Sequence, residues 1–238
     1  MACPVLVWFR DDHRLYDNPA LSAAVATGSQ VLCLFVVDEA SPGLRALGGA
    51  ARWWLHGSLQ SLQNSLEKAG SSLILLRGPA SEVVERTVCE TNASAIFWNR
   101  RYGAAEITID SSLKKRLTER GTKVQSFNGR LLHEPWEIRN QAGGSFQVFT
   151  PYLRAVMGRR IPPPLPAPRR IPGGIWPASI LSSAVALQDL DLEPSHPDWA
   201  GEFKTGWRRG EEAAQEKLDF FLENGLSTTL ALSSVSRG

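Results

Sequence analysis

Charged and amide residues directly follow five strongly apolar runs in the first half of the sequence. Arginines and carboxylates are interleaved at these positions, and aromatic residues precede several of them. The residues are Arg10, Asp11, Asp12, Asp38, Glu39, Arg77, Asn99, Arg100, Arg101 and Asn128. A guanidinium group pairs with carboxylates and stacks on flat rings, so these residue types could bind a small planar ligand. Asp11 and Asp12 could instead form an acid–base pair, but the flanking Arg10 and Arg14 favour ionised carboxylates held in ion pairs.

Several common kinds of active site have no counterpart in the sequence. The turn after the first apolar run is Arg10-Asp11-Asp12-His13-Arg14, where a dinucleotide-binding domain has glycines, and no P-loop spacing occurs. The four histidines are dispersed, so no metal site is expected. No Gly-x-Ser-x-Gly elbow is present. We therefore predict neither a classical NAD or ATP site nor a self-contained hydrolase, with no catalytic residues and no metal.

The apolar runs are predicted to be strands that are buried on both faces of a parallel sheet. Helical patterns alternate with them, as in right-handed doubly wound folds. The predicted strands are Val5–Phe9, Val31–Val37, Leu73–Leu76, Ala95–Trp98 and Val124–Phe127. We therefore predict an α/β fold, a Rossmann-like doubly wound five-stranded parallel sheet with helices on both faces. Ligands bind outside the carboxyl ends of such strands, so the charged residues named above are expected to border one site.

Local signals mark three of the helices between these strands. Asn18 is expected to cap a helix that begins at Pro19 and closes at Gly28. A second helix is expected between residues 51 and 66, where apolar residues repeat at helical spacing. A third helix should stop at Gly121. The residues that mark this third helix are Ile107, Leu113 and Leu117.

The composition is that of a globular protein. The chain has 238 residues with 26 Lys and Arg against 24 Asp and Glu, so its net charge of +2 argues against binding driven by bulk charge. The three scattered cysteines are expected to be reduced and mostly buried. The longest apolar run, Val31–Val37, is too short to cross a bilayer, and no signal peptide is visible. The sequence thus predicts a cytoplasmic protein with no membrane contact.

The second half has a different texture. Nine of the 15 prolines fall between residues 162 and 197, which predicts an extended connector. A helical pattern returns over Glu211–Glu223, with Leu218, Phe221 and Leu222 on one face. We therefore expect an α/β domain over residues 1–160, a Pro-rich inter-domain linker over 161–198 and a short helical stub over 199–238. The basic cluster in the linker is expected to be solvated; it comprises Arg159, Arg160, Arg169 and Arg170.

A long segment, Trp8-Phe9-Arg10-Asp11-Asp12-His13-Arg14-Leu15-Tyr16-Asp17-Asn18-Pro19-Ala20-Leu21, resembles the opening signature of the DNA photolyase/cryptochrome family. Further segments resemble that family's elements in the same order. They are Ala51-Arg52-Trp53-Trp54-Leu55, Trp98-Asn99-Arg100-Arg101-Tyr102, Leu131-Leu132-His133-Glu134-Pro135, Val148-Phe149-Thr150-Pro151-Tyr152 and Gly210-Glu211-Glu212-Ala213-Ala214. The resemblance covers about Pro4 to Thr229, nearly the whole chain.

The resemblance implies an N-terminal α/β domain that carries a light-harvesting antenna pigment, a folate or a deazaflavin, in many members. A helical C-terminal domain binds FAD and damaged DNA, and the excited flavin repairs pyrimidine dimers as a deoxyribodipyrimidine photo-lyase. The antenna positions carried over by the matching motifs are Arg10, Phe35, Val36, Asp38, Arg52, Asn99 and Arg101.

The family's flavin and DNA elements do not occur in the sequence. We therefore expect a photolyase-like chain that is truncated before its FAD-binding helical domain and is inactive alone, with FAD and DNA bound only by a full-length relative. The tail Leu230–Gly238 fits no family element. The Glu211–Glu223 helix is expected to expose an apolar patch that could promote self-association, or to fold back on the α/β domain. The alternative is a stand-alone module that binds a small ligand or a partner without photochemistry.

Overall fold

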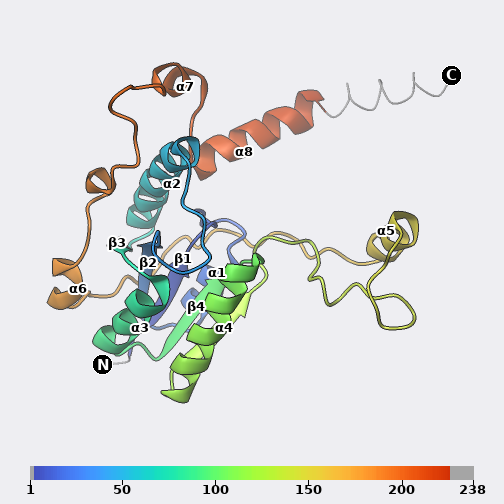
Figure 1. Cartoon of the computed structure of the whole chain (residues 1–238), viewed down its shortest axis with the longest axis horizontal. Coiled ribbons are helices and arrows are strands. Elements are labelled where there is room, and N and C mark those ends of the chain that lie inside the picture. Colours follow the sequence, from blue (N-terminus) through green and yellow to red (C-terminus); the bar gives the residue numbers. More distant parts are fainter. Residues whose placement is uncertain (1–2, 226–238) are drawn as a thin grey trace.

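The computed structural model describes residues 3–225, and a parallel sheet lies at its centre (Figure 1). The sheet has five strands in the order β3-β2-β1-β4-β5. Their bounds are β1 Val5–Phe9, β2 Val31–Val37, β3 Leu73–Arg77, β4 Ala95–Asn99 and β5 Lys123–Phe127. The predicted doubly wound α/β fold is confirmed. All five strands occur where the apolar runs predicted them, and β3, β4 and β5 are each one residue longer.

Helices cover both faces of the sheet because alternate strand residues point to opposite sides. On one face, Val5, Val7 and Phe9 pack with residues of α1 (Pro19–Ala26) and α2 (Gly49–Lys68). On the other, Leu6 and Trp8 pack with α3 (Ala80–Thr91) and α4 (Ala104–Glu119). The connections after β1 and β4 run in opposite directions, so the strand order reverses between these two neighbours.

The predicted helices are confirmed, but one residue expected on a buried helix face, Ile107, is exposed. The Asn18 side chain accepts a hydrogen bond from the backbone N–H of Leu21, and Pro19 opens α1 as predicted. Helix α4 ends at Glu119, just before the predicted stop at Gly121, but Ile107 is 48% exposed, while Leu113 and Leu117 are buried. Ile107 therefore does not belong to the buried stripe of the helix, where Ile109 takes its place.

The proline-rich segment is exposed over residues 161–167 and packs on the α/β domain from Ile171 onward. Ile171, Trp176 and Ile180 are buried against the sheet and its helices, and each contributes roughly 1.5–3 kcal/mol to stability. The segment contains a short helix, α6 (Ala178–Ser182), and a 3-10 turn at Leu187–Leu190. At Gly173, bridged to Val31, an added Cβ would lie 2.6 Å from the carbonyl oxygen of Gly70, so glycine is required there. As expected, Arg159, Arg160, Arg169 and Arg170 are exposed.

Three helices lie outside the sheet layers. Helix α5 (Phe149–Met157) stands away from the sheet at the end of a long loop, and none of its residues is buried (Figure 1). Helix α7 (Gly201–Gly206) and helix α8 (Glu211–Phe220) follow the proline-rich segment, and α8 contacts α2. A π-helical turn at Phe221–Gly225 continues α8. The tail Leu230–Gly238 lies outside the described residues.

The expectation of mostly buried cysteines is wrong. Cys33 in β2 is buried, but Cys3 and Cys89 are exposed, because they lie before β1 and on the solvent side of α3. Among the described residues, no helix combines the length and the apolar character that crossing a membrane requires.

Candidate ligand-binding site at the carboxyl edge of the sheet

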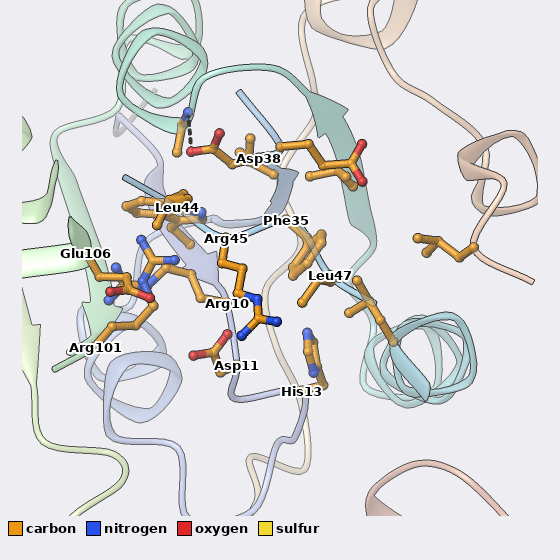
Figure 2. A pocket seen from close by; sticks show the side chains of 17 residues that line it. Arg10, Asp11, His13, Phe35, Asp38, Leu44, Arg45, Leu47, Arg101 and Glu106 are labelled. Atoms are coloured by element: carbon orange, nitrogen blue, oxygen red, sulfur yellow. Dashed lines mark hydrogen bonds between the residues drawn. The ribbon is translucent and has the colours of Figure 1, made fainter. Parts of the chain in front are cut away.

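A pocket of about 230 Å³ lies over the carboxyl ends of β1 and β2 (Figure 2). We call it the crest pocket. Its walls come from the two strand ends, the loop between β2 and α2, the first turn of α3 and the segment after β4. The lining residues are Trp8, Arg10, Asp11, His13, Phe35, Val36, Val37, Asp38, Glu39, Leu44, Arg45, Leu47, Leu55, Ala80, Arg101, Glu106 and Leu192. Five of the seven predicted site residues are among them: Arg10, Phe35, Val36, Asp38 and Arg101.

The strand register explains why residues far apart in sequence meet here. Phe9 lies opposite Phe35 in the parallel pair of β1 and β2, so the turns after both strands begin at the same edge. Phe35 packs in the cluster on the α2 face, and Val36 packs in the cluster on the α3 face. Both side chains border the pocket while also belonging to the core, so the pocket floor is rigid and apolar.

Arg10 is a buried cation at the base of the pocket. Its Nη1 donates to both carboxylate oxygens of Asp110 at 2.6 Å, and its Nη2 donates to the carbonyl oxygen of Asn99. Its guanidinium lies 4.6 Å from the centre of the Trp8 ring. Burial lowers the pKa of Arg10, and the charge of Asp110 opposes that shift. Because these hydrogen bonds go to groups on α4 and β4, Arg10 holds the end of β1 against both elements at the pocket wall.

Arg101 and His13 present buried nitrogen atoms that form no hydrogen bond with the described protein atoms. Nε and Nη2 of Arg101 are buried without a hydrogen-bond partner, and Nη2 lies 3.6 Å from Asp110. Nε2 of His13 is likewise buried and unpartnered, and its ring lies 5.4 Å from Phe35. Burial lowers the pKa of His13, and this effect outweighs the charges of Asp12 and Asp11, which act in the opposite direction. An unsatisfied buried donor is costly, so these groups are suited to a ligand with acceptor atoms.

Asp38 lies at one wall and anchors two loops. Its carboxylate accepts hydrogen bonds from the backbone N–H groups of Ser41 at 2.9 Å and Ala80 at 3.0 Å. Burial alone would raise the pKa of the Asp38 carboxyl, but these hydrogen bonds and that of the Ser41 side chain outweigh burial and lower it. The ionised carboxylate therefore stabilises the start of α3 and the loop that forms the pocket wall.

The other two predicted site residues do not line the crest pocket. Asn99 is buried below it, where its amide donates to Asp12 at 2.6 Å and to Asn18 at 2.8 Å and accepts from the backbone N–H of Ala20. Arg52 lies on α2, pairs with Glu39 and donates to the carbonyl oxygen of Asp191 at 3.1 Å. Both connect segments that surround the pocket, so the structure brings them near it without exposing their side chains to its interior.

Sequence reasoning missed several lining residues. Leu44, Arg45 and Leu47 lie in the loop between β2 and α2, and this loop has neither periodicity nor a motif. Its position after a parallel strand is the one signal that could have indicated it. Leu192 has no local signal, because it reaches the pocket only through the packing of the proline-rich segment. Figure 2 shows Arg45 crossing the pocket near Asp11 and His13.

Comparisons with known proteins agree on one family. The family model described as DNA photolyase matches residues 5–169. A deoxyribodipyrimidine photo-lyase of Agrobacterium fabrum is 42% identical, over 94% of this chain and 45% of its own length. Cryptochrome-1 of Arabidopsis thaliana is 35% identical, over 87% of this chain and 31% of its own length.

The solved structure of a bacterial class III photolyase from Agrobacterium tumefaciens is similar to this chain, with a TM-score of 0.85 and 40% sequence identity. The match covers 94% of this chain and 45% of that one. The chain therefore spans less than half the length of each of these three relatives.

Proposed function

The chain belongs to the DNA photolyase family, and on that premise we propose that its α/β domain binds a light-harvesting chromophore in the crest pocket. The single observation that carries the proposal is the set of buried nitrogen atoms on Arg101 and His13 that form no hydrogen bond, which lie beside the aromatic rings of Trp8 and Phe35. Proteins of this family bind FAD and antenna chromophores.

The residues present fit a flat, anionic pigment such as a folate or a deazaflavin. Arg101 and His13 would donate to its acceptor atoms, and the exposed guanidinium of Arg45 would pair with its carboxylate or phosphate groups. Phe35, Val36 and Leu47 would exclude water from its ring. When bound, the pigment supplies light absorption, and the protein's part is to hold and orient it.

We further propose that light-driven repair of pyrimidine dimers, FAD binding and contact with damaged DNA need sequence that the longer relatives possess and these residues lack. The relatives' lengths support this division, since the chain covers 45% of the photolyase relative. The family acts on damaged DNA. Family membership disfavours a stand-alone binding module without photochemistry.

The test is reconstitution of the purified chain with a reduced methenyl-folate and, separately, with a hydroxylated deazaflavin. Gel filtration removes free pigment, and an absorption spectrum of the protein peak reports what stays bound. We expect one pigment to co-elute with a shifted band at a ratio near one per chain. Elution of both pigments entirely as free compound would refute the proposal.

We also propose that the chain self-associates through the apolar face of α8 and the turn that follows it. Leu218, Phe221 and Leu222 are each about half exposed there, which leaves a contiguous apolar surface. Sedimentation velocity over a range of concentrations should show a dimer or larger species. The variant Leu218→Glu with Phe221→Glu should sediment as a monomer; a wild-type monomer at every concentration would refute self-association.

A further inference from the structure

A run of prolines outside the sheet layers takes no part in the crest pocket or in the apolar face of α8. We call residues 161–168 the proline strip, because five of its eight residues are prolines. The strip lies where the chain returns from α5 toward the sheet (Figure 1). It forms neither helix nor strand, and residues 161–167 are exposed. The strip is therefore an apolar segment that the described part of the chain leaves in solvent.

The chemistry of proline restricts the conformation of the strip. A proline ring fixes its own φ at about −65° and keeps the residue before it in the extended region. Every residue from 161 to 168 either is a proline or directly precedes one. The whole strip therefore favours the polyproline II helix, which repeats about every three residues. Residues three positions apart share one edge of such a helix.

One edge of the strip carries an arginine followed by two prolines. Arg160, Pro163 and Pro166 are spaced three positions apart, and all three are exposed. A different edge carries Leu165 and Pro168, and Pro168 is half-buried. The strip therefore contacts the domain near Pro168, while the edge that begins at Arg160 stays accessible along its length.

Two hydrogen bonds with Asp17 hold the middle of the strip on the α/β domain. The backbone N–H of Asp17 donates to the carbonyl oxygen of Leu165 at 2.8 Å, and the backbone N–H of Leu165 donates to Oδ1 of Asp17 at 3.1 Å. Arg14 donates in turn to the carbonyl oxygens of Asp17 at 2.9 Å and Gly129 at 2.8 Å. The strip is thereby ordered before a partner binds, which lowers the entropy cost of binding.

A groove of about 690 Å³ borders the strip. It is lined by residues 161–165 and 128–132, together with Asp11, Arg14, Asp17 and Pro19. Leu132 in this lining is 69% exposed. Because open space lies along this side of the strip, a partner that grips the strip has room for a wall there.

The strip is flanked by positive charge. Two arginines precede it and two follow it, and residues 159–170 contain no carboxylate. Within residues 3–225 no ion pair engages Arg160, so its guanidinium can pair with an acidic group of a partner. The strip separates the two arginine pairs by about 25 Å and has no aromatic ring on which a base could stack. These features favour a protein partner over a nucleic acid.

From this spacing and exposure we infer that residues 160–166 are a docking segment for a protein domain with an aromatic groove and an acidic rim, as in SH3 domains. Aromatic side chains of such a groove pack against the prolines of a preformed polyproline II helix. Here they would contact Pro163 and Pro166, and an acidic group of the rim would pair with Arg160. The inference goes beyond the chromophore and the self-association proposed above, because none of these residues belongs to either surface.

The experiment is calorimetric titration of the whole chain with an isolated SH3 domain that selects Arg-x-x-Pro-x-x-Pro peptides. The domain should bind in the micromolar range, at least as tightly as it binds a free peptide of residues 157–168, because the chain already orders the segment. Pro163→Ala with Pro166→Ala should abolish binding, and Arg160→Glu should weaken it about tenfold. All three positions are exposed, and circular dichroism checks that each variant is folded.

Two matched variants distinguish the docking edge from the rest of the strip. Pro162→Ala with Pro164→Ala removes two prolines from the other edges and should keep most of the affinity. Arg170→Glu makes the same charge change outside the segment and should leave the affinity unchanged. Equal losses in the two proline variants, binding of the free peptide but not of the chain, or no binding at millimolar concentration would overturn the inference. So would an oligothymidylate that binds the chain and displaces the SH3 domain.

Discussion

Glu211, the first residue of α8, accepts a hydrogen bond from the backbone N–H of Leu15 at 2.8 Å, although 196 positions separate them in the sequence. Its other carboxylate oxygen accepts from the backbone N–H of Tyr16 at 2.7 Å. The carboxylate thus binds the segment that joins β1 to α1, which also carries the crest-pocket residues Asp11 and His13. The helix that follows the proline-rich segment is thereby fixed to the edge of the sheet where the crest pocket lies.

Replacing Glu211 by Gln should therefore loosen α8. One of the two backbone N–H groups would lose its acceptor and the other would keep only a neutral one, so the free energy of unfolding should fall by about 1 kcal/mol in urea titrations. Glu212→Gln is the matched control, because Glu212 is exposed in the same turn. Equal effects of the two substitutions would show that the contact of Glu211 with Leu15 contributes nothing.

The ion pair of Arg10 with Asp110 should be the most sensitive polar contact of the crest. The two side chains are only 4% and 12% exposed, so Asp110→Asn leaves a buried guanidinium without its counter-charge. We expect a loss of about 3 kcal/mol in the free energy of unfolding. Glu119→Gln, in an exposed pair with Lys115 on the same helix, should change it by less than about 0.5 kcal/mol. A small effect of Asp110→Asn would mean that water or the nearby carboxylate of Asp12 compensates the charge.

Substitution of Arg101 should lower the affinity for the chromophore, whereas substitution of Arg52 should not. Arg101 presents unused donors to the crest pocket, so Arg101→Ala should weaken the pigment about tenfold or more, as loss of a charge-assisted hydrogen bond does. Arg52 is directed at Glu39 and Asp191, so Arg52→Ala should have little effect. Equilibrium dialysis with the reconstituting pigment measures both affinities. The opposite ranking would mean that the pigment lies over α2 instead.

The contribution of Asp38 to stability should depend on pH. The pKa of its carboxyl is lower in the folded than in the unfolded chain, so the native state binds fewer protons near that pKa. Its stabilisation is complete above the unfolded pKa of about 3.9 and is lost as the pH falls through the folded value. Asp38→Asn should therefore destabilise the protein at neutral pH by roughly 0.3–1 kcal/mol, as loss of a negative charge near a helix N-terminus does. Urea titrations at neutral and acid pH should show this difference shrinking; a constant difference would exclude the ionised carboxylate as its cause.

Thiol reactivity should follow burial. Burial raises the pKa of the Cys33 thiol to about 12, so almost no thiolate forms there at neutral pH. Cys3 and Cys89 are exposed. A thiol-reactive disulfide reagent should therefore modify two groups quickly in the native chain and three after unfolding in guanidinium. If only one thiol of the Cys33→Ala variant reacted quickly, the result would contradict the exposure of both Cys3 and Cys89.

The sheet could be predicted from the residues alone, because strands buried on both faces need continuous apolar runs and local capping residues mark the helices between them. The sequence also placed Arg10, Asp38 and Arg101 at one edge, since the carboxyl ends of parallel strands must meet there. Motif resemblance added Phe35 and Val36, and the register of β1 with β2 shows why they border the same pocket as Arg10.

Which polar residues face the pocket, and which form hydrogen bonds within the protein instead, depends on how distant segments pack together. Asn99 and Arg52 are polar, like several of the lining residues, but their hydrogen bonds go to Asp12, Asn18 and Asp191. Likewise, no local pattern shows that Leu192 reaches the crest pocket or that Glu211 binds the backbone at Leu15. Such contacts join segments that are distant in sequence, so they depend on the packing of the whole domain and not on any local preference of the chain.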